Sequence, residues 1–244
     1  MNNVERFLNA YALIEREMQR ILDLKEHRRF YIMVDMAAKV NPVIRRHKFD
    51  LREYADLRNA IVHDRADGQI IATPNDEAVK SIEAIASTLL KPPMVIPLFQ
   101  KEVLTLNAGD SVSQAIRCLS TNNYSQAPIL DRGDIRGLIT SNLIVRWMGA
   151  GLAEGSFDLN NTTVGEVLTY ARGRDDYSII SSSTCLFDIP ELFLRFQEKG
   201  SKLEAAIITR QGENHEPIVG IITHRDLPLV QRELFGRVSR KYLV

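Results

Sequence analysis

Two short stretches of the sequence contain residues whose types and spacing suit chemistry on a phosphate. The first is GIITHRDL, Gly220 to Leu227, in which a buried apolar strand is expected to run into the start of a helix. Thr223 would then lie near the helix N-terminus, where free amides and the helix dipole favour a phosphate group. Asp226, one turn later, can accept hydrogen bonds from the vicinal hydroxyls of a ribose.

The same four residues also match a purely local role. Thr-x-x-Asp is a capping box, in which the two side chains only satisfy amides of the first helical turn. Between the two cap positions, Arg225 either reaches a phosphate or faces solvent. The stretch alone therefore leaves ligand binding and capping open.

The second stretch is LRNAIVHD, Leu57 to Asp64. Its candidate polar residues are Arg58, its neighbour Asn59, and His63. Five positions correspond to about 140° of helical rotation, so Arg58 and His63 share a face only if the helix ends near His63. A His in the last helical turn is also favoured simply by the helix dipole.

The elements that must position these residues differ between the two parts of the chain. Apolar residues recur at three- and four-residue steps up to residue 90, which predicts an all-α domain over residues 1–93. The predicted helices cover Val4 to Leu24, Phe30 to Val40, Leu51 to His63 and Asn75 to Leu90. Pro92 and Pro93 then end the last helix, because proline has no amide donor.

After Pro93, short runs of Val, Ile and Leu alternate with helical stretches, which predicts an α/β region. This region contains an internal repeat, since three of its stretches align with three later ones. The aligned pairs are LTLNAGDSV at 104–112 with SIISSSTCL at 178–186, APIL at 127–130 with AAII at 205–208, and GLIT at 137–140 with GIIT at 220–223. We assign the first copy with its linker to residues 94–162 and the second copy with the C-terminal tail to 163–244.

The repeated layout, APIL and GIITHRDL resemble tandem CBS domains, the pair called a Bateman module. The resemblance implies two α/β copies packed through their sheets, with clefts for AMP, ATP, S-adenosylmethionine or cyclic dinucleotides. It assigns Thr223 to phosphate and Asp226 to ribose. Backbone groups would hold the adenine at Ile179, Ile180, Ser181, Ala206 and Ile207.

The first copy departs from this pattern. Its corresponding residues are Thr140, Ser141, Asn142 and Leu143, so that a leucine stands where the ribose carboxylate is expected. Asn142 either reaches a ligand hydroxyl or faces solvent in a first helical turn. The first cleft is therefore in doubt, and one ligand site per chain is consistent with the sequence.

The stretch LRNAIVHD, set in four predicted helices, resembles the signature of HEPN domains. That resemblance implies a metal-independent RNA-cleaving site made by Arg58, Asn59 and His63, usually formed across a dimer. Many domains similar to HEPN are instead binding or dimerisation units. We predict a homodimer on the basis of both resemblances.

Composition limits the other classes of function. Lys plus Arg and Asp plus Glu are 31 each, so any contact with RNA would need a local basic patch on the helical domain. The two cysteines lack metal-ligand spacing, and no apolar run is long enough to span a membrane. We expect a cytoplasmic protein with no metal, no required cofactor and no membrane contact.

These observations predict a regulatory protein that senses an adenine nucleotide or related adenosyl ligand through the α/β pair and signals through the helical domain. Two alternatives remain. One is a ligand-gated ribonuclease that uses Arg58 and His63. The other is a dimeric scaffold without a ligand.

Overall fold

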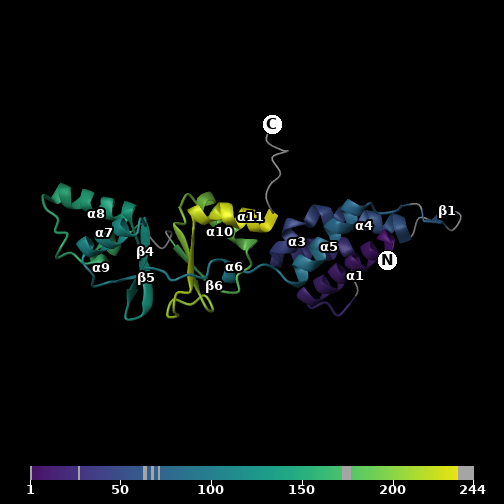
Figure 1. Ribbon diagram of the computed structural model, residues 1–244, viewed down its shortest axis with the longest axis horizontal. Helices are drawn as coiled ribbons and strands as arrows, with labels where there is room; N and C mark the ends of the chain where they lie inside the picture. The colour runs from purple at the N-terminus through teal and green to yellow at the C-terminus, as the bar shows by residue number, and fades with distance from the viewer. Residues whose placement is uncertain are drawn as a thin grey trace, which may run out of the picture. The chain divides into compact units, whose positions relative to one another are not determined.

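The computed structural model divides into two compact units, Met1–Pro93 and Met94–Val244. It describes residues 2–26, 28–62, 65–66, 69–70, 72–171 and 177–235. The first unit is helical and the second contains both helices and strands (Figure 1). In the described ranges, no helix combines the length and the apolar character needed to cross a membrane.

The helices of the first unit follow the predicted apolar periodicity. They are α1 (Asn3–Ile21), α2 (Phe30–Val40), α3 (Pro42–Arg46), α4 (Lys48–Val62) and α5 (Asp76–Leu90), with a short hairpin of β1 (Arg65–Ala66) and β2 (Gln69–Ile70). Asparagine side chains begin two of the long helices: Asn2 accepts from the Glu5 amide at 2.8 Å and Asn75 from the Ala78 amide at 2.8 Å. Both positions match the preference for Asn at the N-cap.

The short helix α3 is a departure from the predicted pattern of helices. Asn41 ends α2, and its side chain then caps α3 by accepting from the Ile44 amide at 3.0 Å. Pro42 suits the first position of a helix because its missing amide needs no partner there. The next helix therefore begins at Lys48, ahead of the predicted start at Leu51, and its expected end at His63 lies outside the described residues.

The second unit is built from two copies of one strand and helix pattern. The first copy contains β3 (Leu106–Asn107), α7 (Val112–Thr121), β4 (Gln126–Asp131), β5 (Asp134–Thr140) and α8 (Ser141–Glu154), and the second contains β6 (Tyr177–Ser181), α10 (Asp188–Glu198), β7 (Ala205–Thr209), β8 (Gly220–Thr223) and α11 (Leu227–Phe235). The three-stranded sheets have orders β3-β4-β5 and β6-β7-β8, each with one parallel and one antiparallel pairing. The connecting elements are α6 (Val95–Leu98), α9 (Val164–Val167) and the 3-10 turns η1 (Leu168–Tyr170) and η2 (His224–Asp226).

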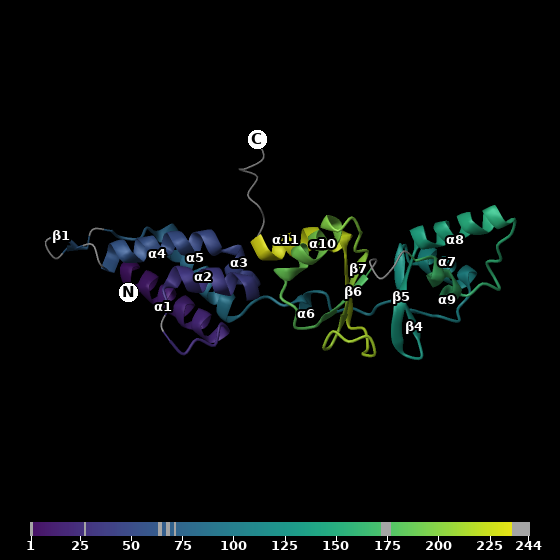
Figure 2. The same ribbon diagram turned by 180° about the vertical axis from the view of Figure 1, so that it is seen from behind.

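The two sheets of the second unit pack face to face. Ile135 and Leu138 of the first copy form one buried cluster with Ala205, Ile207 and Ile221 of the second. Figure 2 shows α7 and α8 on the outer side of one sheet, and α10 and α11 on the outer side of the other. Burial between the sheets is expected because each strand alternates its side chains between two apolar surfaces.

The segment that enters the second unit packs on the second copy, although the sequence groups it with the first. Met94 pairs with Cys185, Gln100 pairs with Gly220, and the Val95 amide donates to the Thr184 carbonyl at 3.0 Å. Val95 is fully buried in the core of the second copy. The α/β pair is thus joined by its own N-terminal segment as well as by its sheets.

Candidate ligand-binding site

The end of β8 brings Thr223 and Asp226 into direct contact. One carboxylate oxygen of Asp226, Oδ2, accepts from the Thr223 amide at 2.7 Å and from its hydroxyl at 2.9 Å. This is the local contact expected of a cap. The other oxygen, Oδ1, accepts no hydrogen bond from the residues that the structure describes.

A cavity of about 370 Å³ opens beside this pair, and we call it the Asp226 cavity. Its walls come from both copies: residues 101–104, residues 122–126 and Pro128 on one side, and Ile221, Thr223, Arg225 and Asp226 on the other. A volume of this size is within the range of small-molecule sites. The capping contact and the lining of a cavity therefore occur together.

The chemistry of this cavity is mixed. Lys101 and Arg225 provide cationic groups of the kind that bind phosphate oxygens, and Asp226 provides a carboxylate acceptor. Val103, Leu104, Pro128 and Ile221 add apolar surface, which a planar base can cover. The arrangement suits a ligand that carries a base, a sugar and an anionic group.

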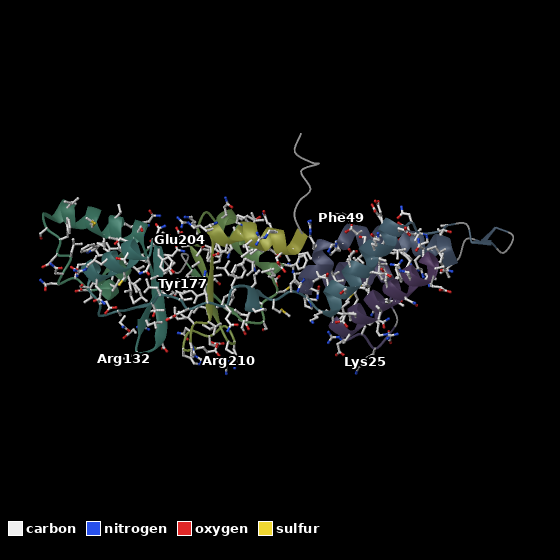
Figure 3. The ribbon with its side chains drawn as sticks, in the orientation of Figure 1. Lys25, Phe49, Arg132, Tyr177, Glu204 and Arg210 are labelled. Atoms are coloured by element: carbon white, nitrogen blue, oxygen red, sulfur yellow. The ribbon has the colours of Figure 1, made fainter. Side chains whose placement is uncertain are left out.

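One contact ties the two copies together at the edge of this cavity. The side-chain amide of Gln126 donates to the carbonyl of Glu204 at 2.8 Å, and Figure 3 labels Glu204. Since Gln126 also lines the cavity, this bond links a wall from the first copy to the sheet of the second.

Ile179 and Thr223 line different cavities. Ile179 lines another cavity, of about 840 Å³, together with Arg136, Tyr177 and Glu213, and we call it the Ile179 cavity. Tyr177, labelled in Figure 3, is partly buried against the cluster between the sheets. The expected adenine-holding residue thus belongs to a space separate from the Asp226 cavity.

The other residues expected to hold adenine line neither of these two cavities. Ile180 and Ala206 face the core of their own copy, and Ile207 is fully buried between the sheets. The Ser181 hydroxyl donates to the Arg210 carbonyl at 3.1 Å. The side chains of Ala206 and Ile207 face opposite sides of their sheet because adjacent residues of a strand alternate between its two faces.

The equivalent position of the first copy forms a buried cap. The Thr140 hydroxyl accepts from the Leu143 amide at 3.0 Å, and Thr140 is only 6% exposed. Leu143 is packed into the core of the first copy. Asn142 is exposed, and neither Thr140 nor Asn142 lines the Asp226 or Ile179 cavity.

Residues 101–104 and 122–126 line the Asp226 cavity and were not identified from the sequence. The internal repeat contained a usable signal, because two copies that pack through their sheets place a loop of one beside the strand end of the other. Sequence reasoning paired residues within the second copy only. The polar turn at Asn122, Asn123 and Tyr124, which precedes β4, was the missed feature.

In the helical unit, Arg58 and Asn59 line a cavity of about 390 Å³ with Tyr11, Arg29 and Tyr31. Tyr11 stacks on Phe30 with ring centroids 4.3 Å apart. Burial raises the pKa of the Tyr11 hydroxyl above its ordinary value of 10.0. His63 lies outside the described residues, so the candidate site in this unit is described by Arg58 and Asn59.

Comparison with known proteins supports the assignment of the α/β region. Residues 96–150 match the family model described as CBS domain. The chain therefore combines N-terminal helices with a CBS-like α/β region. No curated protein matches the chain.

Several solved structures resemble the chain. A CBS domain protein from Streptococcus pneumoniae TIGR4 is 14% identical with a TM-score of 0.43, covering 60% of this chain and 88% of its own. An uncharacterized conserved protein from Pyrococcus horikoshii is 18% identical with a TM-score of 0.43, covering 58% and 93%. A third structure, CbpB in complex with c-di-AMP, is 14% identical with a TM-score of 0.41, covering 57% and 85%. All three TM-scores are below 0.5, and all three identities are below 25%.

Proposed function

We propose that the α/β pair is a regulatory sensor that binds an adenine nucleotide or related adenosyl compound in the Asp226 cavity. The observation that carries this proposal is that Thr223, Arg225 and Asp226 share one cavity with a wall supplied by the other copy. CBS domain proteins are regulatory ligand sensors, and the family match supports a regulatory role.

Each group of the cavity has a role in this proposal. The cationic side chains of Lys101 and Arg225 bind phosphate oxygens, while the Thr223 hydroxyl donates to Asp226 and positions its carboxylate. Oδ1 of Asp226 accepts from a ribose hydroxyl while Oδ2 holds the Thr223 amide and hydroxyl. The base lies on the apolar surface that includes Pro128 and Ile221.

The chain offers a matched control for this carboxylate. Glu166 accepts from the Thr163 amide at 2.7 Å and from its hydroxyl at 2.8 Å, which repeats the contact made by Asp226. Glu166 lines neither the Asp226 nor the Ile179 cavity. Asp226→Asn and Glu166→Gln therefore neutralise the same type of capping carboxylate, and only the first changes the proposed site.

The test is a thermal-shift titration of the intact protein with AMP, ADP, ATP, S-adenosylmethionine and cyclic di-AMP. A ligand at a hundred times its dissociation constant raises the melting temperature by about 5 to 10 °C for a domain of this size. We expect the shift to disappear in Asp226→Asn and to persist in Glu166→Gln. Loss of the shift in Arg136→Ala alone would place the ligand in the Ile179 cavity, and no shift with any compound would favour the scaffold.

A second candidate function is RNA cleavage by the helical unit. The observation that favours it is that Arg58, Asn59 and Arg29 line one cavity, because two guanidinium groups can bind adjacent phosphates. The assay is cleavage of single-stranded RNA in the presence of a chelator. We expect Arg58→Ala and His63→Ala to abolish cleavage while Arg20→Ala, an exposed control paired with Glu17, retains it. Cleavage that survives both variants would rule out this function.

Signalling through the helical unit and homodimer formation belong to the same proposal. Light scattering of the intact chain, with and without the compound that binds, measures both the mass and its dependence on ligand. A mass of one chain at working concentration would contradict the dimer.

A further inference from the structure

The segment of residues 94–104, which we call the strap, connects the start of the second unit to the Asp226 cavity. Its first part lies along the second copy. There the main-chain amide of Val95 donates to the Thr184 carbonyl at 3.0 Å, and the main-chain amide of Lys101 donates to the Val219 carbonyl at 3.2 Å. Its last part, residues 101–104, forms a wall of the cavity. The main chain thus passes directly from its attachment on the second copy to the proposed ligand.

The attachment depends on a close approach at Gly220. A Cβ atom built at Gly220 would lie 2.2 Å from the carbonyl oxygen of Phe99, which is a backbone atom of the strap. Phe99 is itself only 3% exposed and belongs to the core of the second copy. Any side chain at Gly220 must therefore displace the strap or the strand β8.

Glycine is required at position 220 because of this contact and not because of its backbone conformation. Its φ lies outside the left-handed region, so alanine can adopt the backbone conformation at this position. Replacement by alanine consequently tests mainly the contact with the Phe99 carbonyl, because the other close atom, Cδ1 of Ile208 at 3.2 Å, is the end of a flexible side chain.

The first copy contains a matched position. Gly137 begins GLIT as Gly220 begins GIIT, but a Cβ atom at Gly137 would meet the side chain of Leu168, at 2.7 Å. A leucine side chain can change rotamer, whereas the carbonyl of Phe99 moves only with the main chain. Gly137→Ala is therefore the control for a glycine substitution in a β-strand of the same unit.

We propose that Gly220 is a positioning residue for the Asp226 cavity: by admitting the Phe99 carbonyl it seats the strap, and strap seating and ligand binding stabilise each other. This inference rests on the proposed function of the cavity. Coupling of this kind is reciprocal. A strap that is detached from the second copy lowers the affinity for the ligand, and a bound ligand stabilises the attached strap. Since the strap begins immediately after Pro93, ligand occupancy reaches the connection with the helical unit through the main chain.

The first experiment measures affinity by isothermal titration calorimetry, using whichever of AMP, ADP, ATP, S-adenosylmethionine and cyclic di-AMP binds the wild type. We expect Gly220→Ala to weaken binding by about tenfold, within the usual range for coupled sites. Gly137→Ala should stay within about twofold of the wild type for a ligand in the Asp226 cavity, because Gly137 lines the Ile179 cavity and not that one. Equal affinities of Gly220→Ala and wild type would overturn the proposal.

The second experiment measures hydrogen exchange of the amides in residues 94–104. Without ligand, these amides should exchange faster in Gly220→Ala than in Gly137→Ala or wild type, and in the wild type the ligand should slow them. If Gly220→Ala does not fold, the wild-type comparison with and without ligand decides, because unchanged strap exchange at saturation overturns the coupling. If no compound binds, the proposed function fails separately, and the ligand-free comparison of the two variants still accepts or rejects strap seating.

Discussion

The threonine that ends the last strand of each α/β copy has different hydrogen-bond partners in the two copies. In the first copy the hydroxyl of Thr140 caps α8, and Leu143 beside it is buried in the core. In the second copy Thr223 donates to the Asp226 carboxylate, and both residues line a cavity. The three residues after the threonine all differ, and the third of them, leucine in the first copy and aspartate in the second, is packed in the core in one case and lines a cavity in the other.

Thr163 and Glu166 form a third pair of this kind, and Glu166 makes the capping contacts without lining the Asp226 or Ile179 cavity. Glu166 holds the Thr163 amide and hydroxyl, and the Thr163 hydroxyl accepts from the Glu166 amide at 3.2 Å. Asp226 repeats the first two contacts. The hydrogen bonds therefore do not by themselves distinguish a cap from a ligand site, whereas the surrounding cavity does.

The largest expected effect is on the packed side of this comparison. Leu143→Ala should lower the free energy of unfolding by about 2 to 5 kcal/mol, because it leaves a void in the core of the first copy. Urea denaturation measures the loss, with Leu194→Ala, at an exposed leucine, as the control. A loss no larger than that of the control would show that Leu143 is not the packing residue of this helix start.

Asp226→Ala should separate binding from stability. We expect the affinity for the adenosyl compound to fall by more than about tenfold, equivalent to about 1.4 kcal/mol. The unfolding free energy should fall by only about 1 kcal/mol, the usual contribution of a capping side chain. Calorimetry and urea denaturation of the same samples measure the two quantities, and a stability loss without a change in affinity would reduce Asp226 to a cap.

The two threonines provide the next test. Thr140→Val should cost about 1 kcal/mol of unfolding free energy through loss of the cap, and it should leave ligand affinity unchanged. Thr223→Val removes the hydroxyl that donates to Asp226 and positions its carboxylate in the Asp226 cavity, so it should weaken binding. Equal ligand affinities of the two valine variants would contradict the proposal that only the threonine of the second copy belongs to the ligand site.

The smallest expected effect concerns acid stability at the third pair. Hydrogen bonds from the Thr163 amide and hydroxyl hold the pKa of Glu166 below its ordinary value of 4.5. The ionised group therefore stabilises the fold above pH 4.5, and this stabilisation is lost as the pH falls through the lowered pKa. Thermal melts between neutral pH and about pH 3 should show the wild type converging with Glu166→Gln on the acid side. A constant difference across this range would contradict the assignment.

Local patterns in the sequence were sufficient for much of the fold. The apolar periodicity predicted α2 with both of its ends, and the helix predicted over Asn75 to Leu90 is α5, with Asn75 as its N-cap. The three aligned stretches of the repeat lie on equivalent strands, β3 and β6, β4 and β7, and β5 and β8. These features depend on residues a few positions apart, whose side chains must share a face or satisfy neighbouring amides.

The strap and the cavity required the tertiary structure. Nothing near Phe99 in the sequence indicates that its carbonyl occupies the space beside Gly220, and nothing near Thr223 indicates residues 101–104. The resemblance to CBS domains grouped Ile179 with Thr223, and the two residues line different cavities.

By itself the sequence determined the helices, the repeated strands and the threonine and aspartate at the end of β8. Only the tertiary structure decided which segments face Asp226 and which copy receives the strap. The physical reason is that helical periodicity and capping act over a few residues, whereas a cavity wall depends on how two sheets pack, which no local pattern specifies.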